Sequence, residues 1–591
     1  MIPSLVGMGF FISKNPKSLE HCMKLTGSQM VIECLLREGI HTIFGYPGGA
    51  ILPFYQTLPQ YPQLRHILVR HEQGATHAAD GFSRATGKIG VAVATSGPGA
   101  TNMVTGLATA LMDSSPLIAI TGQVARPAIG KDAFQETDVT GVTMPVTKHN
   151  YLVMETKDIP RIMREAFYIA QSGRPGPVLI DIPKDVQQEL AEFEWPDKIS
   201  LPGYKPPADI SHAQIKRAAD LINESQRPLI LAGHGVTISG AFHELRELAE
   251  KAQVPVVTTL LGISSFPESH VLHVGMPGMH GTAWANYAID SADLLIAIGM
   301  RFDDRVTGKV SEFAPNAKVI HIDIDPAEIG KNVKVNAPIV GDVKSVLKAM
   351  LPSITKKTHT EWVAQISRWR KEHPLMLRDT KGLQQQYVIQ KIQEVTKGNT
   401  IIVTGVGQHQ MWAAQYFKSD MPGTFISSGG LGTMGFEVPA AMGAQVGRPD
   451  MTVWSIAGDG GFQMTMAELG TMAQEKIPVK FAIMNNGYLG MVRQWQEVFY
   501  QKQYVATPLF NPDFVKLAEA YGMLGLRVKE KSEVIPAIKQ AMNHPGPVLV
   551  DFRVVEDDNV YPMIAPGTSV KQMIEEQAKL VAMEDPPEAS S

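Results

Sequence analysis

Short apolar runs recur along the whole chain, and each is followed by a glycine-rich turn and a segment of helical period. The runs are continuously apolar rather than alternating, which is typical of strands buried on both faces of a parallel sheet. This succession of strand, turn and helix predicts the α/β class, with doubly wound parallel sheets. The clearest runs are HTIFGYP, GVAVATSG, PLIAITG, GPVLIDIP, RPLILAGHG, VPVVTT, DLLIAIG, KVIHIDID, NTIIVTGVG, TVWSIAGDG, VKFAIMNN and GPVLVDFRV.

Two stretches interrupt this rhythm and divide the chain. Glu192–Asp209 is rich in proline and polar residues, whereas Leu351–Pro374 is charged, lacks strand patterns and is expected to contain a connecting helix. A chain of 591 residues is also too long for one core. We therefore expect three doubly wound domains, at residues 25–195, 205–355 and 380–575. The strings GPVLIDIPKDV and GPVLVDFRVVE close the first and last thirds alike, which hints at a shared topology.

Composition narrows the class of protein. Apolar residues make up 44% and charged residues 19%, with a formal net charge of -4, as in soluble globular proteins. The absence of a basic block argues against a nucleic-acid partner. Cys22 and Cys34 cannot build a disulfide framework, and no apolar run approaches the roughly 18 residues of a membrane helix. The short apolar opening Met1–Ser13 is interpreted as an extension or a poor targeting segment, and the default location is the cytoplasm.

Glu72 stands at the exit of a predicted strand. The strand LRHILV precedes it, and a helix-like segment of small residues follows it. In open α/β sheets ligands bind at the carboxyl ends of strands, and such small neighbours would not shield a carboxylate from a ligand. Glu72 is therefore a candidate catalytic residue. The alternative is a solvated carboxylate at a helix start, which the helix dipole favours.

A second candidate site follows the strand TVWSIA. This strand runs into the turn Gly458–Gly461, whose glycines allow backbone N–H groups to approach a phosphate at the start of a helix. Asp459 would repel a phosphate, so a cation is expected between them. Asn485 and Asn486 end the next strand, and 24 residues separate Gly460 from Asn485. A carboxylate, an amide oxygen and diphosphate oxygens suit Mg²⁺, whereas the alternative is a tight turn plus an Asn-Gly turn.

The sequence GDG, about two dozen residues and then NN resembles the signature of the thiamin-diphosphate enzymes. The resemblance implies that Asp459, Asn486 and the main-chain carbonyl of Tyr488 hold the metal. It also implies that Gly458, Gly460 and Gly461 approach the diphosphate of the cofactor. Such enzymes carry a glutamate in a separate N-terminal domain, and its carboxyl group binds the pyrimidine N1′ of the cofactor. By this resemblance Glu72 is that glutamate.

Longer strings narrow the resemblance to the catalytic (large) subunits of acetohydroxyacid synthase, also called acetolactate synthase, over nearly all of residues 25–575. This family condenses two pyruvates, or pyruvate and 2-ketobutyrate, with loss of CO₂. The products, 2-acetolactate and 2-aceto-2-hydroxybutyrate, lead to branched-chain amino acids. The strings are FGYPGGAILPFY, RHEQGATHAADGFSRATG, TSGPGATN, DAFQETD, RPGPVLIDIPKDV, GMHGTAWAN, RFDDRVTG, GVGQHQMWAAQ, GGLGTMGF and MVRQWQEVFY.

The resemblance implies roles for further residues. Arg305 and Trp495 correspond to the selectors of the second ketoacid, because a guanidinium grips a carboxylate and an indole can prefer a longer alkyl group. The alternatives are a salt bridge with Asp303 or Asp304 for Arg305, and core packing for Trp495. The catalytic set is Glu72, Gln135, Lys184, Arg305 and Trp495, the substrate channel contains Phe134 and Met279, and further thiamin-diphosphate contacts are Gly49, Val406, Gly407, Gln408, His409, Gly432 and Met434. His409 could instead be a satisfied structural histidine, and Met434 a core residue.

The middle domain has a nucleotide-type arrangement without a proper GxGxxG motif, so its residues alone are a weak signal. The family binds FAD here, with a structural role because the reaction has no net redox step. The positions that match its FAD contacts are Arg174, Gly233, Gly235, Thr259, Leu260, His280, Arg301, Asp323 and Asp342.

Glu72 and Asp459 lie in different predicted domains but must meet one cofactor. In the family they come from different subunits, which implies a homodimer or a dimer of dimers, usually with a separate small regulatory subunit. Two other functions remain open. Pyruvate oxidase has the same architecture, but Arg305, Gln135 and Trp495 favour the synthase. A catalytically silent scaffold is the second, and Glu72, Asp459 and Asn486 argue against it.

Overall fold

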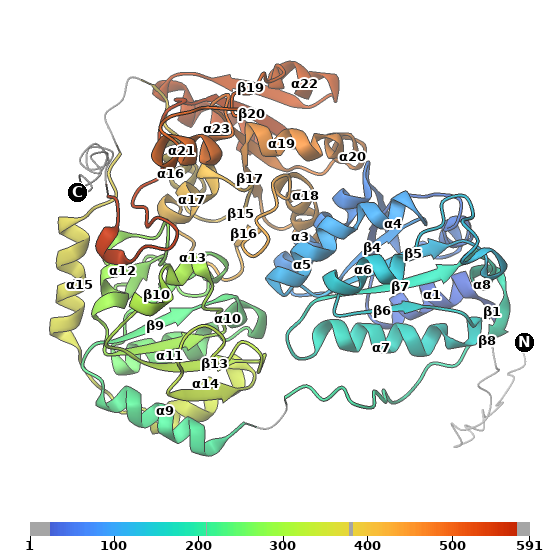
Figure 1. Cartoon of the computed structure of the whole chain (residues 1–591). Coiled ribbons are helices and arrows are strands. Elements are labelled where there is room, and N and C mark those ends of the chain that lie inside the picture. Colours follow the sequence, from blue (N-terminus) through green and yellow to red (C-terminus); the bar gives the residue numbers. More distant parts are fainter. Residues whose placement is uncertain (1–23, 208–209, 378–381, 576–591) are drawn as a thin grey trace, which may run out of the picture.

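The computed structural model describes residues 24–207, 210–377 and 382–575. Met1–Ser13, Cys22, residues 208–209 of the predicted linker and residues 380–381 of the predicted third domain lie outside the described residues. Three six-stranded parallel sheets, each covered by helices on both faces, make up the described chain (Figure 1). The α/β, doubly wound class predicted from the apolar runs is confirmed. None of the described helices has the length and apolar character needed to cross a membrane.

The N-terminal sheet has the strand order β3-β2-β4-β5-β7-β6. Three of its strands, β4, β5 and β7, are fully buried because α1 and α7 cover one face of the sheet and α3 and α5 the other. The strands are β2 (Thr42–Gly45), β3 (Arg65–Leu68), β4 (Gly90–Ala94), β5 (Leu117–Gln123), β6 (His149–Leu152) and β7 (Pro177–Pro183), besides a small antiparallel pair, β1 (Lys24–Thr26) and β8 (Leu190–Glu192). The helices are α1 (Gly27–Arg37), α2 (Leu52–Thr57), α3 (Glu72–Thr86), α4 (Pro98–Asn102), α5 (Val104–Asp113), α6 (Val139–Thr143), α7 (Ile159–Gln171) and α8 (Lys184–Gln188).

The middle sheet has the order β11-β10-β9-β12-β13-β14, which in sequence order is 3-2-1-4-5-6. This is the order of dinucleotide-binding sheets. Its strands are β9 (Pro228–Ala232), β10 (Val256–Thr258), β11 (His273–Gly275), β12 (Leu294–Ile298), β13 (Lys318–Asp323) and β14 (Ala337–Val340). Its helices are α9 (His212–Glu224), α10 (His234–Ser239), α11 (Phe242–Ala252), α12 (Ala283–Ser291), α13 (Asp304–Thr307) and α14 (Val343–Met350).

The C-terminal sheet has the order β16-β15-β17-β18-β20-β19 and therefore repeats the connectivity of the N-terminal sheet, as the similar strings at their ends suggested. The expected connecting helix in Leu351–Pro374 is confirmed as α15 (Thr360–Glu372). The strands are β15 (Ile401–Thr404), β16 (Phe425–Ser427), β17 (Val453–Gly458), β18 (Lys480–Asn485), β19 (Leu524–Val528) and β20 (Val548–Arg553). The helices are α16 (Gln385–Thr396), α17 (Gln408–Tyr416), α18 (Glu437–Gly447), α19 (Asp459–Thr465), α20 (Leu469–Glu475), α21 (Gly490–Phe499), α22 (Phe514–Ala520) and α23 (Lys531–Asn543).

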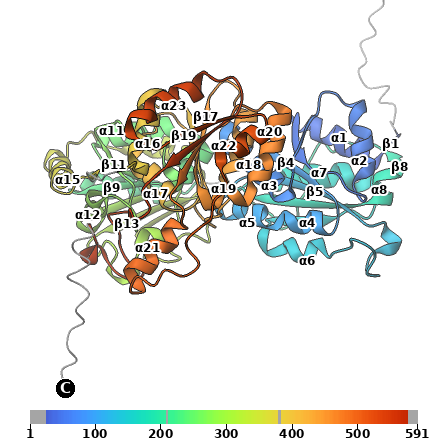
Figure 2. The same cartoon turned by 90° about the horizontal axis from the view of Figure 1, so that it is seen from above.

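Helices α3 and α18 join the N-terminal and C-terminal sheets at the centre of the molecule (Figures 1 and 2). Their backbones approach closely at two glycines. A Cβ atom on Gly81 would lie 2.1 Å from the carbonyl oxygen of Ala440, and one on Gly443 would lie 1.8 Å from that of Ala78. Since no Cβ atom fits these gaps, only glycine permits the contact. Apolar residues of both units share one buried cluster around it.

A buried charge cluster ties all three units together beside these helices. The Arg84 guanidinium donates to Asp80 at 2.7 Å and to Asp113 at 2.8 Å, and also to the carbonyl of Ser427 at 2.7 Å. The Asp113 carboxylate in turn accepts the N–H groups of the C-terminal loop at residues 429 and 430. Nδ1 of His234 in the middle unit lies 2.8 Å from the Asp113 carbonyl oxygen.

Replacing Arg84 by Met should destabilise the protein by about 3–5 kcal/mol, because two buried carboxylates would lose their counter-charge. The midpoint of urea unfolding measures this change. The control is Arg448→Met, whose partner Asp450 is 62% exposed and whose ion pair is expected to contribute about 0–1 kcal/mol. Equal losses in the two variants would contradict the assignment of the cluster as the tie between units.

Candidate functional site

The C-terminal sheet carries a hollow of about 420 Å³ at the carboxyl ends of β15 and β17. The strand order changes direction between these two strands, and ligands of open α/β sheets bind at such a point. The hollow is lined by Gln385, Val406, Gly407, Gln408, His409, Met434, Gly458, Asp459, Gly460, Gly461, Met484, Asn486, Tyr488, Leu489, Gly490, Met491 and Val492. Most of the residues predicted to bind the diphosphate and the metal therefore lie together.

Asp459 begins α19 and is 2% exposed. Its Oδ1 accepts the N–H of Gly460 at 3.0 Å, and its Oδ2 accepts the N–H of Gly487 and the Nδ2 of Asn511, each at 2.7 Å. Burial raises the pKa of this carboxyl to about 6, although the hydrogen bonds oppose the shift. The bond to Gly487 places the GDG turn directly beside the turn after β18, as the spacing of the two motifs predicted.

The two asparagines after β18 have different surroundings. Asn485 donates to Asp551 at 2.8 Å and accepts from Asn511 at 2.9 Å, so its amide is held inside the C-terminal unit. Asn486 instead lines the hollow, and its Oδ1 accepts the N–H of Tyr488 at 3.2 Å. Sequence reasoning missed Asn511, which bridges Asp459 and Asn485, because nothing in its local sequence marks it.

The residues of the hollow fit a diphosphate held through a hard cation. Among the described residues no cluster of three or more His, Cys, Asp or Glu side chains is suited to a metal. A cation here would therefore rely on one carboxylate, amide and carbonyl oxygens, and oxygens of the ligand, as Mg²⁺ does beside phosphates. Residues 458 and 460 must be glycine because their neighbours leave no space for a side chain. A Cβ atom on Gly458 would lie 2.6 Å from the His409 ring, and one on Gly460 would lie 2.8 Å from Leu489.

His409 and Glu437 are buried polar side chains that both lie beside Gly405, close to the hollow. A Cβ atom on Gly405 would lie 2.6 Å from Nε2 of His409 and 2.7 Å from Oε1 of Glu437. Among the described residues, neither Nε2 of His409 nor either oxygen of Glu437 has a hydrogen-bond partner. His409 is therefore not the satisfied structural histidine of the alternative. Burial lowers the pKa of His409 to about 3 and raises that of Glu437 to about 7. Sequence reasoning missed Glu437, whose one signal is an acid in the apolar segment GFEVPAAMG.

Glu72 lies in the other half of the molecule, at the first residue of α3 and directly after β3. Its side chain is 9% exposed rather than solvated, and Oε2 accepts Nδ2 of Asn102 at 2.9 Å. The residue after Gly49 donates its N–H to Thr95 at 3.2 Å, which places that loop beside the TSGPG turn. The carbonyl of Gln135 lies 2.7 Å from a Cβ position on Gly97 in the same turn. Glu72, Gly49 and Gln135 thus lie around the TSGPG turn, at the carboxyl ends of β2, β3 and β4.

Glu72 does not line the hollow of its own chain. Every described residue that lines the hollow comes from residues 385–492, so Glu72 is not among them. Phe134 is 89% exposed, and Gly432 is also exposed. Lys184 is half-buried at the start of α8.

Arg305 and Met279 are neighbours in the middle unit. Met279 donates its N–H to the Arg305 carbonyl at 2.9 Å, and the exposed Arg305 side chain lies 3.8 Å from Asp304. The described contacts of the Arg305 guanidinium thus include the surface ion pair of the salt-bridge alternative and a hydrogen bond from Nη1 to Sδ of Met279 at 3.3 Å. Trp495 is half-buried and packs edge-on against Phe499 at 5.6 Å, so it is not a core residue. Met434 is likewise half-buried, against the core alternative.

The positions matched to FAD contacts gather mainly at one edge of the middle sheet. Gly233 and Gly235 follow β9, and Arg301 follows β12, the two strands between which the order reverses. A Cβ atom on Gly235 would lie 2.6 Å from Cα of Gly299, so the backbones meet without side chains. Thr259 and Leu260 follow β10, Asp323 ends β13, and Asp342 caps α14. Nε2 of His280 has no hydrogen-bond partner among the described residues. Arg174 belongs to the N-terminal unit and forms ion pairs with Asp325 and Glu328 of the middle unit.

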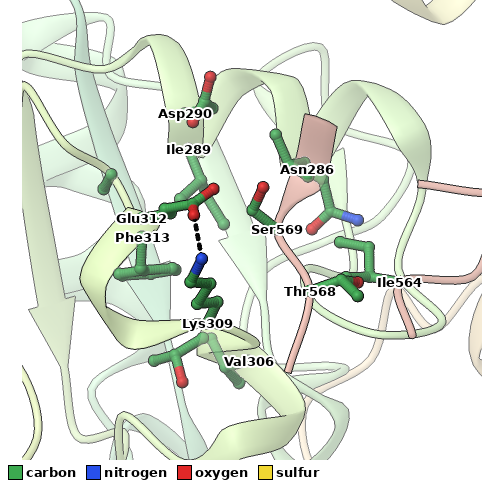
Figure 3. A pocket seen from close by; sticks show the side chains of 13 residues that line it. Asn286, Ile289, Asp290, Val306, Lys309, Glu312, Phe313, Ile564, Thr568 and Ser569 are labelled. Carbon is green, nitrogen blue, oxygen red and sulfur yellow. Dashed lines mark hydrogen bonds and ion pairs between the residues drawn. The ribbon is translucent and has the colours of Figure 1, made fainter. Parts of the chain in front are cut away.

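A second hollow of about 350 Å³ lies between the middle unit and the C-terminal segment, and Figure 3 shows its lining. Lys309 is the basic side chain that lines it, and it forms an ion pair with Glu312, which also lines the hollow. The Asn286 amide accepts the N–H of Gly278 and donates to the Gly278 carbonyl oxygen. None of the sequence-predicted site residues lines this hollow, so the candidate chemistry belongs to the hollow of the C-terminal sheet.

Comparisons with known proteins agree with this arrangement of three units. Residues 25–142 match the thiamine pyrophosphate enzyme N-terminal TPP binding domain, residues 215–350 the central domain, and residues 405–552 the C-terminal TPP binding domain. An acetolactate synthase of Mycobacterium bovis is 53% identical over 561 residues, covering 92% of this chain and 91% of the relative. The acetolactate synthase large subunit of Corynebacterium glutamicum is 51% identical over 92% of this chain and 89% of the relative. That of Porphyra purpurea is 49% identical over 93% and 95%.

Glu437 should make stability depend on pH. Its pKa is raised from 4.5 in the unfolded chain to about 7 in the fold, so the folded protein holds a proton that the unfolded chain releases. The fold therefore loses about 3 kcal/mol as pH rises from 4.5 through 7. We expect Glu437→Gln, which cannot titrate, to gain unfolding free energy relative to the parent over this range, measured by urea unfolding at several pH values.

Glu533→Gln serves as the control. Backbone N–H groups of residues 529 and 530 lower the pKa of Glu533 below 4.5, so its carboxylate stabilises the fold above that pH and the stabilisation is lost only as pH falls below it. The difference in unfolding free energy between this variant and the parent should therefore stay constant from pH 4.5 to 7. A pH-independent difference between Glu437→Gln and the parent would contradict the buried neutral carboxyl.

Proposed function

Because the chain belongs to the acetolactate synthases of the thiamine pyrophosphate enzyme family, we propose that it condenses two pyruvates to 2-acetolactate with loss of CO₂. It also joins pyruvate to 2-ketobutyrate to give 2-aceto-2-hydroxybutyrate, and so serves branched-chain amino-acid biosynthesis in the cytoplasm. The observation that carries the proposal is the hydrogen bond between Asp459 and Gly487 at the hollow. It brings the GDG and NN turns together on a chain about half identical to acetolactate synthases.

In this proposal the hollow holds the diphosphate end of thiamin diphosphate through Mg²⁺. Asp459, Asn486 and the Tyr488 carbonyl provide the protein oxygens, and the Gly458–Gly461 turn offers N–H groups to the diphosphate. The residues after β15, from Val406 to His409, form the opposite wall. When bound, thiamin diphosphate supplies the carbon nucleophile for the keto group and accepts the electron pair left by departing CO₂.

Glu72 holds the proton at the pyrimidine N1′ of the cofactor. Two features of the fold support this role. The carboxyl is buried, and the Asn102 amide occupies one of its oxygens at 2.9 Å, which orients the other. A hydrogen bond to N1′ in a site that excludes water can be stronger than one in solvent. Gln135, Lys184, Phe134 and Met279 line the approach of substrate.

Arg305 and Trp495 select the second ketoacid. An exposed guanidinium whose surface ion pair with Asp304 is 3.8 Å long can exchange that partner for a substrate carboxylate at little cost. A half-buried indole offers an apolar face to the extra methyl group of 2-ketobutyrate, and such a group contributes about 1–3 kcal/mol to discrimination.

FAD occupies the middle unit in a structural role. The strand order 3-2-1-4-5-6 and the side-chain-free approach of Gly235 to Gly299 support a dinucleotide at the point where the order reverses. Arg174, Thr259, Leu260, His280, Arg301, Asp323 and Asp342 are its proposed contacts, with Gly233 and Gly235.

The active unit is a homodimer or a dimer of dimers, because Glu72 does not reach the hollow of its own chain. Glu72 of one chain then faces the diphosphate hollow of its partner, and Gly49, Gly432 and Met434 meet the rest of the cofactor. A separate small regulatory subunit completes the assembly.

The reaction itself is tested with purified protein, Mg²⁺, thiamin diphosphate, FAD and pyruvate under air. We expect acetolactate and CO₂ with little oxygen consumption, because no step transfers electrons to the flavin. All three quantities are followed together, and added 2-ketobutyrate then measures selectivity. Stoichiometric oxygen uptake with acetate or acetyl phosphate would show a pyruvate oxidase instead.

The shared site is tested by mixing two inactive variants, Glu72→Gln and Asp459→Ala. If each site takes Glu72 from one chain and Asp459 from the other, mixed dimers contain one intact site. After subunit exchange, roughly a quarter of the parental activity should return. Mass spectrometry of the intact dimers provides the control for exchange. Mixed dimers without activity would mean that both residues serve one site within a chain.

A further inference from the structure

Glu468 reaches from the C-terminal unit to the start of the helix that carries Glu72. It ends a short 3₁₀ turn (Met466–Glu468) between α19 and α20 and is 1% exposed. Its Oε1 accepts the backbone N–H groups of Arg70 and His71, each at 3.0 Å, and its Oε2 lies 3.1 Å from the same N–H of Arg70. One carboxylate thus holds the two residues that directly precede Glu72.

The surrounding bonds tie the same two segments together. The Thr471 hydroxyl lies 2.9 Å from Oε2 of Glu468 and 2.9 Å from the Leu68 carbonyl oxygen, and its one proton can be donated to either acceptor. The Arg70 side chain donates to that carbonyl and to Gln474, also at 2.9 Å. Two of these four bonds, Thr471 to Leu68 and Arg70 to Gln474, cross between the two units, as do the bonds from Arg70 and His71 to Glu468. The path of the backbone into Glu72 is therefore set largely by the C-terminal unit of the same chain.

The start of α3 leaves space for the Glu468 carboxylate. Gly74, one turn into α3, leaves the room, because a Cβ atom there would lie 2.2 Å from Oε1 of Glu468. Burial raises the pKa of the Glu468 carboxyl to about 7, and the N–H groups of Arg70 and His71 at the helix start oppose this shift because they favour the charged form. Within α3 itself, the His71 side chain accepts the N–H of Gln73 at 3.1 Å, so Glu468 complements a local cap.

We propose that Glu468 is a positioning residue for Glu72, which fixes through the backbone of Arg70 and His71 where the Glu72 carboxyl meets the pyrimidine N1′ of thiamin diphosphate. The inference rests on the proposed role of Glu72. A carboxyl group displaced by about 1 Å from a reacting system can lose about 100-fold in rate. Glu468 itself touches neither the substrate nor the cofactor.

The test is the exchange of the C2 proton of bound thiamin diphosphate for deuterium, followed by NMR after acid quench in the presence of Mg²⁺. This readout isolates the contribution of Glu72 from substrate binding and product release. Glu468→Gln keeps the volume but leaves a single acceptor oxygen, so an NH₂ group takes the place of Oε2 beside the Arg70 N–H and the Thr471 hydroxyl. We expect it to slow exchange about 10- to 100-fold while the affinity for thiamin diphosphate and the thermal midpoint stay near parental values.

Two further variants make the result decisive. Gly74→Ala keeps the charge of Glu468 but displaces its carboxylate, and it should slow exchange as well. Glu533→Gln is the matched control, because Glu533 also accepts two consecutive N–H groups, at 2.8 Å and 3.0 Å, but at the distant helix α23, and its exchange should be unchanged.

Parental exchange in a folded Glu468→Gln protein that binds thiamin diphosphate would overturn the inference. If that variant does not fold, parental exchange in Gly74→Ala overturns it. Loss of cofactor binding in both would also contradict it, because Glu468 would then support the fold rather than Glu72. Parental exchange in Glu72→Gln marks a different failure, that of the proposed function itself.

Discussion

The packing of α3 against α18 is the constraint on which both halves of the candidate site depend. Each helix begins with a glutamate, and each follows the second strand of its sheet. Because Gly81 and Gly443 bring the backbones into direct contact, no layer of side chains can absorb a shift between the two units. The Arg84 cluster then fixes their orientation, since a buried ion pair tolerates little change in geometry. Asp113 extends this control to the loop that leads to Met434.

Local pattern predicted the parts of the structure that depend on neighbours in sequence. Continuous apolar runs gave the parallel sheets, and Glu72 and Asp459 were identified because each directly follows a strand. The turn after β18 was expected beside the GDG turn, since adjacent parallel strands end at one edge. These predictions required only strand direction and short-range geometry.

Contacts between distant segments could not be predicted in this way. Asn511 reaches Asp459 across 52 residues, and Glu468 reaches Arg70 across 398. Neither side chain belongs to a local motif, and nothing in the sequence around Asp459 or Arg70 indicates which distant side chain will meet it. In the middle unit, the absence of GxGxxG made the motif weak. There the strand order, which arises from tertiary packing, gives a stronger argument than the glycines themselves.

The repeated connectivity of the outer sheets gives the molecule an internal two-fold likeness. One topology is used twice, and duplication of a single ancestral unit is its simplest origin. After such an event the two copies would have diverged: in one, Glu72 at the helix start accepts a hydrogen bond from Asn102, and in the other the corresponding Glu437 is fully buried beside the glycine-rich turns of the hollow.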